Sequence, residues 1–377
     1  MIDDLTLCEV ISGWTPPSAE KTKNIIGVLP GEGIGPEIIE VCLNVLDAVT
    51  QGTSVRFRVE EGGDIGLPAQ QKTGRVLTGE VVSFVESIFS AGGAVLCGPG
   101  GGRFVYELRS EFDLFCKVTP IRPLPPLLDV GVVKADSLKD VDMLIVRENA
   151  GGIYFGRWEE AQDGDGARAS HTFQYRENEV ERILCVAVAL ARGRRRRLSL
   201  VLKPDGIPSI SRLWIDLFER IVKGSGLKSQ VLQVDYAAYH LIHAAQDFDV
   251  IVCPNLFGDI LSDLGGLLMG SRGMCFSGNF GKDGRAVYQT GHGAAYDLSG
   301  RDRANPIGQL CSLAMLLRVS FGQQGLAQRI DAAMEKVVRE GWRTADMASP
   351  GCRVIGTREL GYRIVEAIEA LNEVRAA

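Results

Sequence analysis

Apolar and polar positions along this chain alternate between strand-like and helix-like periods. From Asn24, the apolar run NIIGVLP leads through the glycine turn GEGIG into PEIIEVCLNVLDAVT, where apolar residues recur with a helical period. Pro36 stands at the first position of this helix, which suits a residue without a backbone N–H. A strand-like alternation follows in VRFRVEE, and a second helix is predicted in GEVVSFVESIFSAGG, which ends at a glycine pair.

The same pattern continues to the end of the chain. Further strands are predicted in AVLCGPGGG, DMLIVREN, LSLVLK, QVLQVDY and DVIVCPN. Further helices are predicted over 176–192, 208–224, 236–247, 259–269, 306–321, 325–340 and 358–374. Strands that alternate with helices of this length predict an α/β fold around a largely parallel sheet.

Length and composition are those of an ordinary globular protein. The 377 residues suffice for about two domains. With 45% hydrophobic and 23% charged residues, a disordered chain, a coiled-coil rod and a collagen-like repeat are excluded. The net charge of −6 argues against a nucleic-acid partner, because phosphate binding needs a clustered basic surface. The one basic run, Arg192 with Arg194–Arg197, is interpreted as a solvated helix end that complements the helix dipole.

Cysteine usage and the N-terminus bear on the compartment. Nine cysteines are scattered singly, without a CxxC or CxxH pair, which argues against a zinc site or a disulfide framework and favours a reducing compartment. Residues 1–23 form an extension ahead of the first strand, with Asp3 and Asp4 where a signal peptide needs positive charge. No stretch approaches 18 uninterrupted apolar residues, so no membrane span is predicted. We expect a cytoplasmic protein.

Glycine is in surplus, with 45 residues, and part of it falls in the first strand-to-helix turn. The sequence GEGIGPE does not have the GxGxxG spacing of a dinucleotide fingerprint. The acidic residues Glu60 and Glu61 also lie farther on than the roughly 20 positions that a Rossmann fold requires. Taken alone, this motif predicts a tight turn at least as well as a phosphate-binding loop.

Two carboxylates in VIVCPNLFGDILSDLGGLLMGSRGM carry a more specific signal. Asp259 and Asp263 are four residues apart, which places them on one face of the predicted helix. They could simply complement the helix dipole. However, their neighbours are apolar, and unpaired carboxylates are costly in such surroundings. Oxygen ligands at this spacing favour Mg²⁺ or Mn²⁺ over zinc.

A glycine-rich stretch, TGHGAAYDLSGRDRANPIG, is typical of a binding loop because it is long, small and polar. It contains His292, Asp297 and Asn305. Asp297 could accept hydrogen bonds from a ribose diol or could cap a turn, and its spacing does not decide between the two.

On these motifs the chain resembles the β-decarboxylating dehydrogenases, a family of isopropylmalate, isocitrate and tartrate/malate-type enzymes. The resemblance covers most of the chain from Asn24, through IIGVLPGEGIGPE, LRSEFDLF, IVRENAGGIYFG, NLFGDILSD and HGAAYDLSGRDRANP in order. It implies a non-Rossmann homodimer with the active site in the cleft between two α/β domains. A large cofactor-binding domain would comprise 24–115 and 270–377, and a small dimerisation domain 116–269 with an intersubunit arm at about 150–175.

The resemblance also implies roles for single residues. Mg²⁺ or Mn²⁺ would be held by Asp259 and Asp263 together with Asp235 of the neighbouring subunit, and would chelate the substrate hydroxyl and its adjacent carboxylate. Lys203, in LSLVLKPDG, would help remove the hydroxyl proton. Tyr175, in TFQYRENEVERI, would protonate the enolate carbon.

Substrate carboxylates would bind Arg109 and Arg147, whose planar guanidinium groups suit them. A third arginine of the family is replaced by Thr119, and neither Lys117 nor Arg122 stands at an equivalent position. This departure predicts a non-standard substrate.

The helix start that recognises the variable side group points the same way. It carries Val105 and Tyr106, where isopropylmalate enzymes tend to have two leucines and isocitrate enzymes have serine and asparagine. A partly apolar pocket with a phenolic wall is therefore expected. In the glycine turn Glu32 replaces the usual aspartate, and in the cofactor loop Tyr296 replaces the usual proline.

The predicted cofactor is NAD. The resemblance assigns its binding to His292, Gly293, Asp297 and Asn305. A carboxylate at Asp297 would hold the ribose hydroxyls and repel a 2′-phosphate. The nearby cations Arg301 and Arg303 leave NADP open.

The predicted function is NAD- and metal-dependent oxidative decarboxylation of a 3-substituted malate, a small-molecule 2-hydroxy dicarboxylate. The alternatives are a tartrate/malate-type or isocitrate dehydrogenase, and a non-catalytic regulatory subunit. Retention of the catalytic and metal-binding residues together argues against the last.

Overall fold

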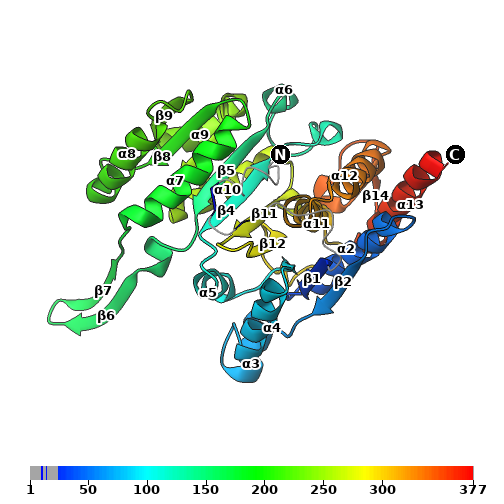
Figure 1. Cartoon of the computed structure of the whole chain (residues 1–377), viewed down its shortest axis with the longest axis horizontal. Helices are drawn as coiled ribbons and strands as arrows, with labels where there is room; N and C mark the ends of the chain where they lie inside the picture. The colour runs from blue at the N-terminus through cyan, green and yellow to red at the C-terminus, as the bar shows by residue number, and fades with distance from the viewer. Residues whose placement is uncertain (1–9, 12–13, 15–23, 377) are drawn as a thin grey trace.

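The computed structural model describes residues 10, 11, 14 and 24–376, and its centre is one ten-stranded sheet (Figure 1). The strand order is β2-β1-β3-β12-β11-β4-β5-β10-β8-β9. The strands of this sheet are β1 (Asn24–Leu29), β2 (Phe57–Glu61), β3 (Ala94–Cys97), β4 (Cys116–Ile121), β5 (Met143–Glu148), β8 (Arg197–Leu202), β9 (Lys228–Gln233), β10 (Val250–Cys253), β11 (Phe276–Phe280) and β12 (Ala286–Thr290). Two short strands, β13 (Trp342–Arg343) and β14 (Arg353–Val354), pair separately.

Helices cover the sheet and supply most of the remaining core. They are α2 (Gly35–Thr50), α3 (Gly66–Thr73), α4 (Gly79–Ser90), α5 (Phe104–Glu111), α6 (Ala135–Leu138), α7 (Glu177–Arg192), α8 (Pro208–Val222), α9 (Val234–His243), α10 (Asn255–Leu268), α11 (Ile307–Phe321), α12 (Gln324–Arg339) and α13 (Thr357–Ala376). The C-terminal helix α13 packs against α2, at the right of Figure 1.

The α/β prediction is confirmed, with an antiparallel centre that was not foreseen. Strand β4 pairs antiparallel with both β5 and β11, and β11 pairs antiparallel with β12, whereas the outer pairings are parallel. Strand β4 carries the polar residues Lys117 and Thr119 on one face, which hides the apolar pattern of a buried strand.

The strand order separates the chain into an outer and a middle part. Strands from residues 24–97 and 276–290 occupy one half of the sheet, and strands from residues 116–253 occupy the other half. Strand β4 begins the middle part of the chain, and α10 ends it before the outer part resumes at β11.

A two-stranded hairpin projects from the body at the lower left of Figure 1. Its strands β6 (Arg157–Asp163) and β7 (Gly166–Thr172) pair antiparallel from Arg157 opposite Thr172 to Asp163 opposite Gly166. Nearly all of its residues are exposed in one chain. This hairpin falls within the segment 150–175 that was expected to be an arm.

Two residues of the basic run, Arg194 and Arg195, bond to other parts of the fold, whereas the sequence suggested a solvated helix end. The side chain of Arg194 is 9% exposed, and it bonds both to Asp142, at 2.8 Å, and to the buried Asp249, at 2.9 Å. Arg195 donates to the carbonyl oxygen of Phe248. Ion pairing inside the fold therefore accounts for part of the run.

Most of the extension 1–23 lies outside the described residues. Of those described, Trp14 donates from Nε1 to the carbonyl oxygen of Gly281 at 2.8 Å, and its ring meets Phe280 edge-on at 5.7 Å. The eight described cysteines are free thiols. No helix in the described part is both long and apolar enough to cross a membrane.

Candidate active site

Arg147, near the carboxyl end of β5, is the centre of the candidate site. It is 1% exposed, its Nε donates to Oδ1 of Asn255 at 2.8 Å, and its Nη1 donates to Asp259. Both partners lie on α10, which approaches β5 closely at Gly258, where a Cβ would lie 2.7 Å from Cβ of Arg147. The remaining nitrogen, Nη2, is buried without a hydrogen-bond partner among the described residues.

A second buried arginine, Arg109 on α5, faces the same space. It is 5% exposed, and its Nε also lacks a partner in the described chain. Burial, with the nearby charge of Arg147, lowers the pKa of Arg109 to about 9. Two buried guanidinium groups with unused donors are therefore gathered at one place, an arrangement that suits an anionic ligand.

Strand β4 adds Lys117 and Thr119 to this space. Lys117 lies directly opposite Arg147 in the antiparallel register, and Thr119 follows two residues on, on the same face. Both side chains are buried, and Oγ1 of Thr119 has no hydrogen-bond partner in the described part of the chain. Burial lowers the pKa of Lys117 well below its usual value, and the charges of Arg109 and Arg147 lower it further.

Two of the three predicted metal ligands, Asp259 and Asp263, lie one helical turn apart on α10. Asp259 accepts hydrogen bonds from Arg147 and, at 2.7 Å, from the hydroxyl of Tyr154. Burial alone would raise the pKa of Asp259, but Arg147 and Tyr154 lower it overall. Asp263 is exposed and pairs with Arg272 at 3.1 Å. Since α10 begins at Asn255, neither carboxylate lies in its first turn, which weakens the helix-dipole interpretation.

Tyr175 is joined to this cluster through one asparagine. Its hydroxyl accepts from the backbone N–H of Asn255 at 3.1 Å, and its ring meets Trp214 edge-on at 5.5 Å. Burial, together with the charge of Glu148, raises the pKa of Tyr175 well above its usual value. Asn255 therefore bridges Tyr175 and Arg147.

Lys203 and Asp235 form a separate pair. Lys203 Nζ lies 2.8 Å from Oδ1 of Asp235 and 3.1 Å from Oε1 of Gln233. Asp235 stands in the first turn of α9, because the strand predicted in QVLQVDY ends at Gln233. Among the hydrogen bonds and ion pairs of the described residues, none joins this pair to Arg147 or Asp259.

Within one chain the predicted metal ligands are not assembled. Over the described residues, no three His, Cys, Asp or Glu side chains are grouped to hold a metal ion. The expected site takes Asp235 from a second subunit, so the metal site stays a prediction. The oxygens of Asp259 and Asp263 share one helix face, and a carboxylate that already accepts two hydrogen bonds has lone pairs left for a cation.

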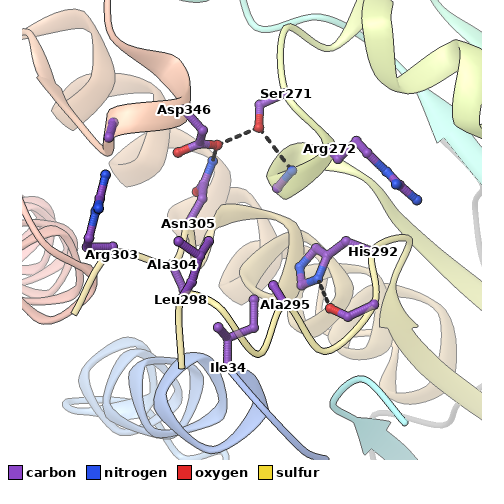
Figure 2. Close-up of a pocket in the computed structure, with 13 residues that line it drawn as sticks. Ile34, Ser271, Arg272, His292, Ala295, Leu298, Arg303, Ala304, Asn305 and Asp346 are labelled. Atoms are coloured by element: carbon purple, nitrogen blue, oxygen red, sulfur yellow. Dashed lines mark hydrogen bonds between the residues drawn. The ribbon is translucent and has the colours of Figure 1, made fainter. Parts of the chain in front are cut away.

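A cavity of about 620 Å³ lies at the glycine-rich loop (Figure 2). Of the predicted cofactor residues, His292, Gly293 and Asn305 line it, whereas Asp297 is exposed and is not among the lining residues. Asn305 is held in place by its hydrogen bond to Asp346, at 2.9 Å. The cavity could accept a nucleotide-sized ligand.

The glycine turn of the first strand forms one side of this cavity. The N–H of Ile34 donates to the carbonyl oxygen of Ala294 at 2.9 Å, and a side chain at Gly33 would overlap that same oxygen. Gly33 also has a φ of 62°, which favours glycine. The turn GEGIG therefore holds the binding loop by direct backbone contact.

Two departures from the family pattern meet beside this cavity. Glu32 is 2% exposed and accepts from the N–H of Leu67 at 2.8 Å. Burial and a hydrogen bond to Glu32 raise the pKa of Tyr296 to about 12. The longer carboxylate and the tyrosine thus form a contact between the glycine turn and the loop.

Aromatic side chains line the space above the two arginines. The ring of Tyr106 lies 5.2 Å from that of Tyr154 and 6.2 Å from that of Phe155, and the guanidinium group of Arg109 lies 5.7 Å from its centre. Val105, also on α5, is partly buried and packs against the hydrophobic core. The ring of Tyr106, with Tyr154 and Phe155 beside it, is in the place where a phenolic wall was expected.

Sequence reasoning missed Asn255 and Tyr154, although both lie within the quoted motifs IVRENAGGIYFG and NLFGDILSD. Their functional atoms contact residues 80 to 108 positions away in sequence. The sequence did contain one signal for Asn255, because it is a polar residue at the start of an otherwise apolar helix.

The fold is α/β, and it contains a cluster of buried basic side chains and a separate cavity of nucleotide size. Residues 25–364 match the isocitrate/isopropylmalate dehydrogenase family, and the chain belongs to this family. It is an oxidoreductase of the class that oxidises and decarboxylates 2-hydroxy acids.

Similar proteins span nearly the whole chain. A 3-isopropylmalate dehydrogenase from Synechococcus sp. (strain JA-3-3Ab) is 38% identical, covering 94% of this chain and 95% of its own length. One from Pseudomonas putida is 36% identical, over 91% of this chain and 98% of its own. The structure of an isocitrate dehydrogenase from Methylococcus capsulatus has a TM-score of 0.82 and 28% identity, over 92% of this chain and 99% of its own.

Proposed function

We propose that this protein catalyses NAD- and divalent-metal-dependent oxidative decarboxylation of a 3-substituted malate. The observation that carries the proposal is the pair of buried arginines, Arg109 and Arg147, whose unused donors lie beside Asp259. The relatives named 3-isopropylmalate dehydrogenase support a malate with a group at C3 as the substrate class.

The arginines would bind and orient the carboxylates. Arg147 is fixed by Asn255 and Asp259, so its free Nη2 has a defined direction before the substrate arrives. Arg109 offers its Nε from the opposite wall. Rigid, desolvated donors of this kind position a dianionic substrate with little further ordering.

Asp259 and Asp263, with Asp235 of the neighbouring subunit, would hold Mg²⁺ or Mn²⁺. When bound, the ion would polarise the substrate hydroxyl and stabilise negative charge after loss of CO₂.

Lys203 would receive the hydroxyl proton, directly or through water. Because its Nζ is bonded to Asp235, the subunit that supplies Asp235 must also supply Lys203. The proposed enzyme is therefore a homodimer with shared active sites. The strand order supports domain boundaries near residues 115 and 270, and the exposed hairpin β6–β7 supports an intersubunit arm.

Tyr175 would donate the final proton to the enolate carbon. Its buried hydroxyl keeps its proton at neutral pH, because burial raises its pKa. The backbone N–H of Asn255 donates to the hydroxyl oxygen of Tyr175 and so holds it in place. A neutral, oriented phenol is suited to act as a general acid.

NAD would bind in the cavity lined by His292, Gly293 and Asn305. Asp297 lies in the same loop but outside the cavity lining, and its carboxylate would repel a 2′-phosphate and so favour NAD, whereas Arg303 in the lining would attract one. Non-polar lining from Ile34 and Leu298 suits a nucleobase.

The C3 group would contact Val105 and Tyr106, and the ring of Tyr106 lies beside the further aromatic rings of Tyr154 and Phe155. The wall formed by Val105 and Tyr106 on α5, together with Thr119 on β4, differs from the one expected of isopropylmalate and isocitrate enzymes. We therefore propose that the substrate carries a non-standard group at C3.

A panel of 3-substituted malates, assayed with Mn²⁺ and NAD by NADH absorbance, tests the proposal. We expect turnover of at least one member, loss of turnover with EDTA, and weak activity on 3-isopropylmalate and isocitrate. Efficient turnover of either of these two would contradict the divergent substrate. Inactivity toward the whole panel would contradict the function itself.

A further inference from the structure

We propose that Lys117 is a substrate-binding residue, completing with Arg109 and Arg147 a three-cation subsite matched to a dianionic substrate. The proposal rests on the proposed function and assigns one more residue to that site. Its basis is the place of Lys117 in the sheet.

Lys117 and Arg147 form a like-charge pair across two strands. They are directly opposite in the β4–β5 register, so their side chains leave the same face of the sheet with Cβ atoms roughly 5 Å apart. Like charges in this relation are destabilising, and burial makes them more so. Negative charge between the two side chains would relieve this repulsion.

The protein itself does not supply enough negative charge. Among the described residues, Lys117 forms no hydrogen bond or ion pair, although it is only 7% exposed. Asp259 already accepts from Arg147 and Tyr154, and Asp263 pairs with Arg272. Three buried basic side chains therefore share one carboxylate in direct contact, that of Asp259, while the exposed Asp263 acts on Lys117 only through its charge.

A dicarboxylate would bring negative charge to this cluster of unpartnered donors. Arg109 and Arg147 each have one buried nitrogen without a partner, and Thr119 has an unpartnered hydroxyl on the same face as Lys117. A dianion between α5 and the paired strands β4 and β5 would satisfy all of these groups at once.

Kinetics of Lys117→Met, with the substrate found in the panel, test the proposal. We expect KM for the acid to rise by about 10- to 100-fold, as for loss of a charged hydrogen bond, while KM for NAD stays unchanged. Lys117→Arg should restore most of the affinity. Lys139→Met serves as the control, because Lys139 is exposed and remote, and it should behave as wild type.

A binding measurement separates substrate recognition from turnover. With Mg²⁺ present, malate should raise the Tm of the wild type more than lactate does at equal concentration. In Lys117→Met, which replaces a buried cation by an apolar side chain of similar length, we expect the unliganded Tm to be maintained and the advantage of malate over lactate to be lost.

The outcomes distinguish this proposal from the function on which it rests. If the wild type turns over a substituted malate and Lys117→Met has an unchanged KM for it, Lys117 does not bind substrate and the function stands. If Lys117→Arg folds and its KM for the acid is as high as that of Lys117→Met, then loss of the positive charge at position 117 does not explain the weaker substrate binding. If no malate is turned over or bound, the proposed function fails first.

Discussion

Individual side chains connect parts of the site that are distant in sequence. Asn255 uses its side chain to hold Arg147 and its backbone N–H to hold Tyr175, so one residue fixes both the anion-binding group and the proposed proton donor. Tyr154 donates to one carboxylate oxygen of Asp259 while Arg147 donates to the other. These contacts explain why single substitutions at this scale should change chemistry and stability together.

Glu148 gives a prediction about pH at the same scale. It is fully buried beside Tyr175, and burial raises its pKa from about 4.5 to about 7, although the N–H groups of Ala150 and Gly151 oppose this. Between these pH values the folded chain retains a proton that the unfolded chain has lost. The free energy of unfolding therefore falls as pH rises through this window, by at most on the order of 3 kcal/mol.

The variant Glu148→Gln should have a smaller change in Tm between pH 5 and pH 7.5 than the wild type, whatever its absolute Tm. Glu80→Gln, at an exposed position in the first turn of α4, is the control. An unchanged pH dependence in Glu148→Gln would contradict the assignment of this proton.

At the scale of elements, α10 and β5 form the rigid support of the site. Gly258 allows the helix to lie against Arg147 without a gap, so Asn255 and Asp259 reach its guanidinium group from consecutive turns. The support depends on close contact between backbone and side chain, which tolerates little added volume.

Gly258→Ala should therefore lower stability by roughly 1–3 kcal/mol and weaken substrate binding, because the new methyl group would displace Arg147. Thermal unfolding and KM for the acid measure the two effects. Gly325→Ala in α12, where a Cβ meets nothing, is the matched control. Wild-type Tm and KM in Gly258→Ala would contradict this account of the packing.

Sequence patterns predicted the long helices better than the central strands. The helices α7, α8 and α11 begin and end within about two residues of the prediction, because their apolar periods are sustained. Strand β4 was missed because Lys117 and Thr119, which serve the site, interrupt its apolar character. Helix α10 begins at Asn255, four residues before the predicted start at 259; the earlier start was not predicted because Asn255 and Gly258 are poor helix formers and only tertiary contacts explain them.

The same limit applies to the site. The spacing of Asp259 and Asp263 predicted their shared helix face, since that relation is local. The partners of Arg147 and Tyr175 could not be predicted, because they depend on how strands from separate segments are ordered. The opposition of Lys117 and Arg147 likewise follows only from the register of β4 against β5.

At the scale of the whole molecule, the main prediction is that two subunits build each active site. Within one chain Lys203 bonds to Asp235, and no hydrogen bond or ion pair of the described residues joins the two to Arg147, so we expect them to complete the site of the neighbouring subunit. Lys203→Met and Asp259→Asn should each be inactive alone. If two subunits build each site, unfolding and refolding the two variants together should restore about a quarter of wild-type activity, because half of the dimers then contain one intact site. No recovery, despite mixed dimers confirmed by mass, would contradict shared sites.

The central claim is that this chain couples oxidation of a 2-hydroxy acid to loss of a carboxylate. Its most direct test is to measure NADH and released CO₂ together during turnover of the best substrate from the 3-substituted malate panel, with Mn²⁺ present. The account predicts equal amounts of the two products, and none of either when EDTA is present. NADH formed without CO₂, as in a simple hydroxy-acid dehydrogenase, would contradict it.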